Sequence, residues 1–434
     1  MTLIASMPLA VTASKLRSGE LNLIYFINSL CDRIELFDPQ INAFLPEMGR
    51  RERLLKEADT LLKRYPDPDT RPLFFGIPIG VKDIFRADGF ETHCGSALPE
   101  TLFRGTEAAS VSRLKELGAL VAGKVVTTEF AYFEPGPTKN PHNIEHTPGG
   151  SSSGSAAVVA AGLLPFAFGT QTIGSVVRPA AFCGVFGYKP TYGRIDASGV
   201  IPFSVSADHI GFFTQDMEGV VLAASVLCNK WNEEIALTAD KIALGIPCGR
   251  YFEQASDEIK NIFIAQTEAL KHAGFVIKEV DLFEDIEEIN RVHRLMVAAE
   301  MAEVHKGWFK ENEALYRQKT WDLIVEGFDI CSSDLHDAIN GRFKLRDRIE
   351  AAKAEYGIDL WVTPATITPA THGLESTGSP LMSLPWTYAG LPSLNIPGWK
   401  NDEGLPVGLQ FTGSFNRDET FLLQCAVVHA ALSA

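Results

Sequence analysis

Apolar residues near the start of the chain recur at the spacing of a helix. Residues 12–65 are helical in pattern, and in the clearest part of this segment apolar residues recur at steps of three or four, which places them on one helical face. The clearest series is Leu23, Ile27, Leu30 and Ile34. A second, charged helix is expected over residues 50–64, because prolines at positions 66 and 68 end it. The N-terminal segment is therefore predicted to be helical.

Short apolar runs alternate with helical patterns over the rest of the chain. We expect strands over 77–81, 120–126, 166–169, 241–247, 275–280 and 359–363. We expect helices over 107–117, 155–161 and 257–273. Such alternation is typical of proteins in which helices on both faces cover a central sheet. The predicted fold class is α/β, with a central mixed, mainly parallel sheet.

The domain organisation follows from the continuity of these patterns. No flexible linker, internal repeat or low-complexity tract interrupts the chain. Residues 1–434 are therefore expected to form a single large domain, whose core over 70–230 carries the glycine-rich motifs described below. Residues 285–355 are charge-rich and helical in pattern. We interpret them as a helical insertion that packs over the sheet and shapes a pocket.

The composition fits a globular protein with an acidic surface. Hydrophobic residues make up 46% of the chain, charged residues 21%, and the net charge is −15. A surface of this sign repels phosphate backbones, so no nucleic-acid partner is expected. The seven cysteines are scattered and never spaced as C-x-x-C, which argues against a disulfide framework or a structural zinc site. Buried thiols in a reducing cytoplasm are the simplest interpretation.

The sequence predicts neither a targeting segment nor a membrane span. The apolar residues 1–11 have no charged region ahead of them, unlike a secretory signal. The most apolar run, 156–169, is broken by Gly162 and Pro165 and is shorter than the roughly 20 residues that cross a bilayer. We therefore expect a cytoplasmic protein without a membrane partner.

Three glycine-rich runs carry polar side chains that suggest chemistry. They are G-I-P-I-G-V-K-D over 76–83, P-G-G-S-S-S-G-S over 148–155 and G-T-Q-T-I-G-S-V-V-R-P over 169–179. Taken alone, the second run predicts a turn that caps the next helix. A phosphate-binding loop would need a lysine at its end, which this run lacks. A nucleophile elbow of the α/β-hydrolase type would need a strand directly before Ser152, where the sequence has prolines instead.

Two residues of these runs stay ambiguous on their own. Lys82 ends an apolar strand and is either a salt-bridged structural residue or a base that burial keeps neutral. The adjacent Asp83 need not pair with it, because neighbouring side chains of a strand point to opposite faces. Ser175 lies either in a plain strand-to-helix turn or beside a row of main-chain N–H groups able to bind an oxyanion.

Together, the three runs closely resemble the amidase signature family. Ser151 and Ser175 are 24 residues apart, as in that family's pattern. The resemblance extends to the helical segment 16–44 and to C-terminal blocks at 359–364 and 384–413. It implies the amidase signature fold and hydrolysis of a carboxamide to a carboxylate and ammonia or an amine.

The resemblance also implies a catalytic triad. Ser175 would be the nucleophile and form an acyl-enzyme. Ser151, in a cis peptide with Gly150, would relay the proton of Ser175. Lys82 would be the final base, and Ser152 would help to hold Lys82 by a hydrogen bond. Such chemistry is sound, because a serine hydroxyl is a weak nucleophile until a positioned base activates it.

The third run would supply the oxyanion hole from the main chain of Thr172, Ile173 and Gly174. It departs from the family at two positions. Many members have glycine at the position of Ile173, so the isoleucine is expected to narrow or stiffen the loop. Many have aspartate at the position of Gln171, so one supporting charge is absent. Arg178, three residues after Ser175, is predicted either to pair with a buried carboxylate or to bind an acidic substrate.

The resulting prediction is an amidase that needs no metal, nucleotide or organic cofactor. Its partner would be a small-molecule amide, and the sequence allows a homodimer. Two alternatives stay open: the A subunit of a glutamyl-tRNA amidotransferase complex, and a non-catalytic binding protein on an amidase scaffold. The sequence does not name the amide, since a fold does not determine a substrate.

Overall fold

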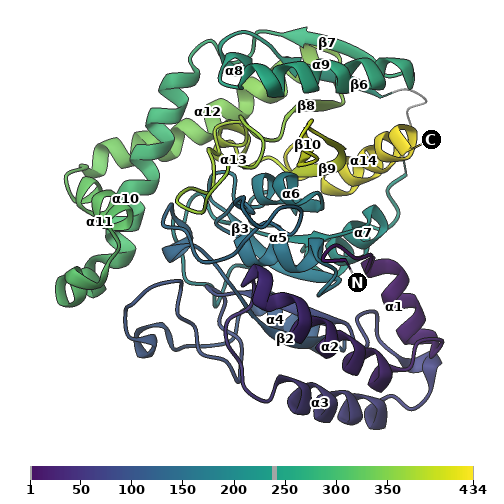
Figure 1. Ribbon diagram of the computed structural model, residues 1–434. Coiled ribbons are helices and arrows are strands. Elements are labelled where there is room, and N and C mark those ends of the chain that lie inside the picture. The colour runs from purple at the N-terminus through teal and green to yellow at the C-terminus, as the bar shows by residue number, and fades with distance from the viewer. Residues whose placement is uncertain (1, 237–241, 434) are drawn as a thin grey trace.

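A mixed sheet of ten strands forms the centre of the molecule (Figure 1). The computed structural model describes residues 2–236 and 242–433. Within them the strand order is β2-β1-β3-β5-β4-β9-β10-β8-β6-β7. The strands are β1 (Pro78–Lys82), β2 (Leu120–Val125), β3 (Phe166–Gln171), β4 (Phe186–Lys189), β5 (His209–Thr214), β6 (Ala243–Pro247), β7 (Val276–Val280), β8 (Leu360–Pro364), β9 (Ser393–Lys400) and β10 (Pro406–Thr412).

Helices flank this sheet along its whole length. The α-helices are α1 (Leu9–Ser18), α2 (Leu23–Ile41), α3 (Arg50–Arg64), α4 (Ala109–Glu116), α5 (Ser153–Ala160), α6 (Val177–Cys183), α7 (Met217–Leu227), α8 (Arg250–Glu253), α9 (Asp257–His272), α10 (Ile286–Asn312), α11 (Gln318–Phe328), α12 (Ser332–Tyr356), α13 (Leu384–Tyr388) and α14 (Asp418–Ser433). Short 3₁₀ helices are η1 (Pro68–Thr70), η2 (Glu100–Phe103), η3 (Glu129–Ala131) and η4 (Glu313–Leu315). The expected single α/β domain with a mixed sheet is confirmed.

The strands pair in parallel only toward the two edges of the sheet. The pairs β1–β2, β1–β3, β6–β7 and β6–β8 are parallel. The pairs β3–β5, β4–β5, β4–β9, β9–β10 and β8–β10 are antiparallel. Antiparallel pairing therefore dominates the middle of the sheet, where a mainly parallel arrangement was expected.

This difference has a simple origin in the strands that the sequence analysis did not assign. All of the assigned strands are in the structure, with bounds that differ by one or two residues, except that Lys241, the start of one of them, lies outside the described residues. The unassigned strands are β4, β5, β9 and β10, and each has an antiparallel neighbour. The segment 285–355 consists of α10, α11 and α12; its status as an insertion stays a prediction.

The alanine-rich helix α5 packs directly on the parallel edge that carries Lys82. Every residue of α5 is buried, and the helix contacts β1, β3 and β5. A β-carbon on Gly154 would lie 2.4 Å from the main-chain nitrogen of Val126, so only glycine permits this close approach. The glycine-serine run is thereby held against the residue that follows β2, the strand next to β1.

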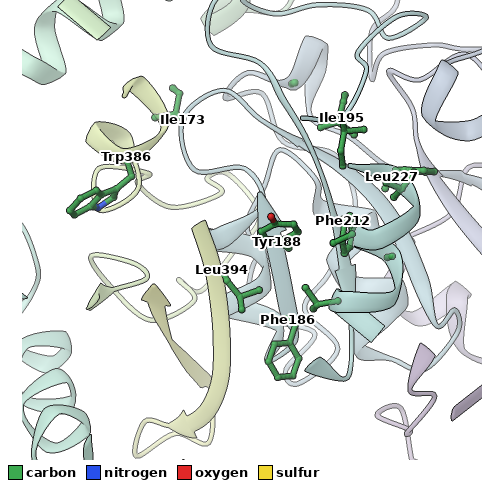
Figure 2. Close-up of a cluster of buried hydrophobic side chains, with 14 of the residues drawn as sticks. Ile173, Phe186, Tyr188, Ile195, Phe212, Leu227, Trp386 and Leu394 are labelled. Carbon is green, nitrogen blue, oxygen red and sulfur yellow. The ribbon is translucent and has the colours of Figure 1, made fainter. Parts of the chain in front are cut away.

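A continuous apolar core joins the middle of the sheet to the loop after β3. Tyr188 of β4 is paired with Phe212 of β5 and Leu394 of β9, and Figure 2 shows these side chains on neighbouring strands. Ile173 and Trp386 belong to the same cluster, and Figure 2 shows them beside each other at the short helix α13. The loop that carries Ile173 is therefore anchored in the main core.

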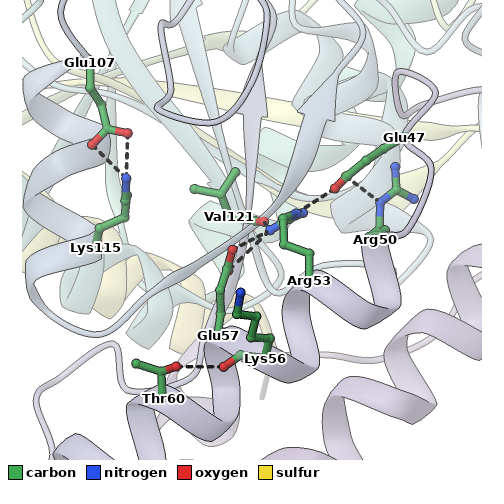
Figure 3. Close-up of polar contacts among 9 residues, drawn as sticks. All are labelled: Glu47, Arg50, Arg53, Lys56, Glu57, Thr60, Glu107, Lys115 and Val121. Atoms are coloured by element: carbon green, nitrogen blue, oxygen red, sulfur yellow. Dashed lines mark hydrogen bonds and ion pairs between the residues drawn. The ribbon is translucent and has the colours of Figure 1, made fainter.

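Polar contacts of Arg53 join helix α3 to the edge strand β2 (Figure 3). The Arg53 guanidinium donates to the main-chain oxygen of Val121 at 2.9 Å and pairs with Glu47 at 2.7 Å. Glu47 also pairs with Arg50 at 3.2 Å. Figure 1 shows α10, α11 and α12 at the other side of the molecule from these helices. None of the described helices is both long enough and apolar enough to cross a bilayer.

Candidate active site

Lys82 and Ser151 meet in the interior, although the chain separates them by many residues. Lys82 is the last residue of β1 and has no exposed surface. Its Nζ lies 2.8 Å from Oγ of Ser151 and 2.7 Å from Oγ1 of Thr170. The end of β1, the start of α5 and the end of β3 thus contribute one side chain each. Thr170 was not predicted, although it lies in the third glycine-rich run.

The surroundings of Lys82 favour a neutral amine. Asp83 turns to the other face of β1 and pairs with Lys124 of β2 at 2.7 Å. Among the described residues no carboxylate forms an ion pair with Lys82. Burial lowers the pKa of Lys82 from 10.5 to about 7, and the more distant charge of Asp208 opposes part of this shift. Of the two roles left open by the sequence, the ion-paired one therefore has no support.

The serines around the proposed triad have different partners. The Gly150–Ser151 peptide is cis, and Ser151 is 2% exposed. Ser152 has no exposed surface, and its hydroxyl contacts the main-chain oxygen and nitrogen of Thr170, both at 3.3 Å. The expected direct hydrogen bond from Ser152 to Lys82 is therefore replaced by an indirect link through Thr170. A fully buried Ser152 with no strand before it also gives no support to a nucleophile elbow.

Ser175 lies in the loop between β3 and α6. It is 7% exposed, and its hydroxyl makes no hydrogen bond to another described side chain or main-chain group. The main-chain N–H groups of Thr172, Ile173, Gly174 and Ser175 likewise donate to none of the described residues. A row of unpaired donors next to a serine is the arrangement that stabilises a developing oxyanion.

Gln171 holds this loop from within. Its Oε1 accepts from the main-chain nitrogens of Val176 and Val177 at 2.8 and 3.0 Å. Its Nε2 donates to Oγ1 of Thr387 at 2.9 Å, and that hydroxyl donates to the main-chain oxygen of Ile173 at 2.7 Å. The amide therefore supplies the acceptor that an aspartate would offer, without a buried charge.

Three further contacts hold the Thr172–Ser175 loop, which we call the oxyanion loop after its expected role, from outside. The hydroxyl of Thr172 donates to Asp208, whose pKa burial raises to about 6. Nε2 of His293 on α10 donates to the main-chain oxygen of Thr172 at 3.1 Å. A β-carbon on Gly174 would lie 2.9 Å from Cβ of Pro380, which explains why this position has no side chain. Asp208 and His293 lie far from the motifs in sequence, so no local pattern pointed to them.

Arg178 is buried at 1% exposure on α6. Its Nη2 donates to the main-chain oxygen of Gly150 at 2.6 Å and to Oγ1 of Thr377 at 3.2 Å. Its Nε and Nη1 have no hydrogen-bond partner among the described residues, and burial lowers the Arg178 pKa to about 9. No buried carboxylate in the described part of the chain pairs with it, so this expected alternative has no support. Its hydrogen bond holds the carbonyl group of Gly150, the residue directly before Ser151, in place.

The described residues contain no cluster of three or more His, Cys, Asp or Glu side chains placed to hold a metal ion. The groups that hydrogen bonds bring together are Lys82, Ser151 and Thr170, and Ser175 lies in the loop that follows β3. With one amine of lowered pKa, a contacting hydroxyl and a row of unpaired N–H groups, the site is equipped for acyl transfer through serine.

Comparison with known proteins agrees with this geometry. A family profile described as Amidase matches residues 26–422. The A subunit of glutamyl-tRNA(Gln) amidotransferase from Geobacter metallireducens is 30% identical over 459 residues, which cover 94% of this chain and 93% of that protein. A crystal structure of an amidase superimposes with a TM-score of 0.86 at 29% identity, covering 98% of this chain and 99% of the other. The peptide amidase of Stenotrophomonas maltophilia gives 0.80 at 26% identity, with 99% and 98% covered. The chain therefore belongs to the Amidase family.

Proposed function

We propose that this chain hydrolyses a carboxamide through an acyl-enzyme on Ser175, with Ser151 and Lys82 carrying the protons. The contact of 2.8 Å between Nζ of Lys82 and Oγ of Ser151 is the observation that supports this most. An amine whose pKa is about 7 is neutral in a large fraction of molecules at neutral pH. It is then able to accept the proton that Ser151 passes on.

The first half-reaction forms the ester. Oγ of Ser175 attacks the amide carbon while its proton passes to Ser151, and the proton of Ser151 passes to Lys82. The carbonyl oxygen becomes an oxyanion that the N–H groups of the Thr172–Ser175 loop stabilise. When the C–N bond breaks, Ser151 gives its proton to the leaving nitrogen and regains one from Lys82. The products are free ammonia or amine and an acyl group on Ser175.

The second half-reaction repeats these steps with water. Water attacks the ester carbon and loses its proton toward Ser151 and Lys82. The C–O bond to Ser175 then breaks and the serine recovers a proton through the same relay. The acid product gives its remaining proton to the solvent or to the released ammonia or amine and leaves as a carboxylate. One water is consumed for each amide. Lys82 returns to its neutral form.

Arg178 as a binding residue for an acidic substrate stays a prediction. Its two unpartnered guanidinium nitrogens suit a carboxylate. Both nitrogens are buried, however, so a carboxylate would reach them only after the surrounding residues move. The hydrogen bonds that Arg178 makes in the structure go to the carbonyl of Gly150 and to the hydroxyl of Thr377.

The amidotransferase alternative keeps the same chemistry and adds partners. The relatives named as the A subunit of glutamyl-tRNA(Gln) amidotransferase match along most of their length, so the expectation of no nucleic-acid partner is unsupported. The two proposals differ in what the isolated chain does. A stand-alone amidase releases ammonia from simple amides on its own, whereas a component of an amidotransferase needs its complex. The sites of Lys82, Ser151 and Ser175 are intact, which disfavours a non-catalytic binding protein.

The decisive experiment combines labelling with turnover. Purified full-length chain is treated with a fluorophosphonate probe, and ammonia release is measured over a panel of neutral, aryl and acidic amides. We expect a single adduct on Ser175, and Ser175→Ala is expected to lower kcat by about 10⁴-fold or more. Ser225→Ala serves as control, because its hydroxyl donates only within its own helix, to Leu222. Labelling of Ser152, or unchanged turnover in Ser175→Ala, would contradict the proposal.

A further inference from the structure

A cavity of about 450 Å³ adjoins the oxyanion loop. Its wall includes Tyr132 and Phe133 after η3, Ile173 of the loop, Val297 of α10, and Leu381 and Leu384 near α13. This volume lies within the range of about 300–1,000 Å³ that is usual for small-molecule sites. We call it the Ile173 cavity.

Ile173 connects this cavity to the reaction centre. Its main-chain N–H belongs to the unpaired row of donors, while its side chain lines the cavity and is 9% exposed. His293 lines the same wall and donates to the adjoining Thr172 carbonyl at 3.1 Å. When the carbonyl oxygen of an amide binds at the N–H row, one of the two groups on its carbonyl carbon therefore lies next to the cavity.

The charged groups of the cavity wall already have partners within the protein. Arg294 pairs with Glu326 at 2.6 Å and also contacts the Tyr132 hydroxyl at 3.3 Å. Arg291 pairs with Glu288 at 2.7 Å. Glu287, the third charged residue of the wall, pairs with Arg250 at 3.2 Å. Each described charge of the wall therefore faces an opposite charge of the protein.

The uncharged polar groups of the wall also offer no positive charge to a substrate. Burial lowers the pKa of His293 to about 4, so its ring is neutral at pH 7. Asn290 donates to Gln254 at 3.0 Å, and its Oδ1 is a buried acceptor without a partner. The wall thus offers carbon surface and an acceptor, which suits an apolar group rather than an anionic one.

The path of the proton decides which of these two groups, the acyl group or the leaving nitrogen, faces the cavity. The leaving nitrogen must lie beside Ser151, which gives it a proton. The residues that line the cavity do not include Ser151, Lys82, Thr170 or Ser175, and the cavity borders the N–H row at Ile173. We infer that the Ile173 cavity binds the apolar acyl group of the amide, such as an aryl or branched alkyl group. This inference rests on the proposed function and names the substrate class of the same site.

The test uses neutral primary amides, in which only the acyl group varies. We expect kcat/KM for phenylacetamide to exceed that for acetamide by at least about 10²-fold, because one methylene in a hydrophobic pocket already contributes roughly 10–200-fold and the phenyl ring adds more apolar surface than that. Phe133→Ala is expected to lower kcat/KM for phenylacetamide about 10-fold and that for acetamide less than about 2-fold. Leu381→Ala is a second variant with the same expectation. Phe343→Ala is the matched control, because this phenylalanine on α12 is 47% exposed and lies outside the cavity.

Binding to Ser175→Ala separates this inference from the proposed function. Calorimetric titration of that variant with phenylacetamide is expected to show binding that the added Phe133→Ala change weakens about 10-fold. Equal kcat/KM along the amide series, or binding unaffected by both Phe133→Ala and Leu381→Ala, would overturn the inference while Ser175 labelling still supported catalysis. Binding sensitive to Phe133 without any labelling or turnover would support the cavity and contradict the proposed function.

Discussion

Two buried lysines near Asp83 show how a partner decides the chemistry of a residue. Lys124 on β2 pairs with Asp83 at 2.7 Å and is 4% exposed. Lys82, next to Asp83 in the chain, has two hydroxyl partners and no exposed surface. Desolvation without a counter-charge disfavours the ammonium form. Lys124 is therefore suited to a structural role and Lys82 to proton transfer.

The pH dependence of activity should report the Lys82 pKa. Below about pH 7 the amine is protonated and cannot act as a base, so kcat/KM is expected to rise tenfold per pH unit and reach a plateau above about pH 7. Lys82→Arg is expected to lose most of the rate, since guanidinium stays protonated. Rates of ammonia release between pH 5 and 9 test this, with Lys124→Arg as a control that keeps the rising limb. A Lys82→Arg variant with near-normal turnover would refute the role of Lys82 as base.

The lowered pKa of Lys82 also makes the free energy of unfolding depend on pH. The ordinary pKa of a lysine is 10.5, and that of folded Lys82 is about 7. Between these values the unfolded chain binds one more proton than the folded chain, so the contribution of Lys82 to the free energy of unfolding increases with pH. Below about pH 7 both states are protonated and the cost of burying the charge is present in full. Urea unfolding of wild type and Lys82→Met at pH 6 and 9 measures this difference.

Arg178 should act on all substrates alike if its contact with Gly150 is its main role. Removing the guanidinium in Arg178→Met takes away the hydrogen bond of 2.6 Å to the Gly150 carbonyl. We expect kcat to fall about 10-fold for neutral and acidic amides together, which corresponds to one hydrogen bond from a charged donor. The ratio of kcat/KM for succinamate and butyramide checks this. A loss confined to succinamate would instead give Arg178 the substrate-binding role.

At the scale of elements, helix α10 supports the oxyanion loop by two routes. His293 donates to the Thr172 carbonyl directly. About two turns further along the helix, Glu300 accepts from the main-chain nitrogen of Ser206 at 2.9 Å. The loop it holds contains Asp208, which accepts from the Thr172 hydroxyl. The geometry of the proposed oxyanion hole therefore depends on a helix more than one hundred residues away in sequence.

His293→Phe tests the direct route. The change keeps an aromatic ring on the cavity wall but leaves the Thr172 carbonyl without its donor. We expect kcat to fall about 10-fold while KM for acetamide changes less than about 2-fold, because the loop acts mainly on the transition state. His336→Phe on the exposed face of α12 is the control. A change in KM alone would assign His293 to substrate binding instead of loop positioning.

At the scale of the whole molecule, the C-terminal helix closes on the middle of the sheet. Asp418, the first residue of α14, has no exposed surface. Its Oδ1 accepts from the Tyr188 hydroxyl at 2.7 Å and from the main-chain nitrogen of Thr191 at 2.8 Å. Its neighbour Glu419 pairs with Arg194 at 2.7 Å. These contacts join the end of the chain to strand β4, more than two hundred residues earlier.

Asp418→Ala should destabilise the fold without changing the residues of the proposed active site. It leaves two donors on β4 and the loop after it without an acceptor inside the protein, which costs about 1–3 kcal/mol each. We expect the free energy of unfolding in urea to fall by about 2–5 kcal/mol. The folded fraction should still label at Ser175. Asp402→Ala, at an exposed position, is the control, and a loss no larger than in this control would contradict the role of Asp418.

The sequence by itself determined the parts whose information is local. Helical periodicity and short apolar runs located the edge strands and most of the helices, because a buried face imposes its spacing on the residues that form it. The three glycine-rich runs offered Lys82, Ser151 and Ser175 as candidates, because close main-chain approaches require glycine over a few consecutive residues. The resemblance of the three runs together to the amidase signature family gave these residues their expected roles.

Only the tertiary structure decided the rest. Strands β4, β5, β9 and β10 gave no clear pattern, and their antiparallel pairing in the middle of the sheet depends on neighbours distant in the chain. Thr170 as the second partner of Lys82, Gln171 as an uncharged support and His293 as a donor to the oxyanion loop became visible only in contact. The lowered pKa of Lys82 has the same origin, since desolvation depends on everything packed around the amine and not on the residues beside it in sequence.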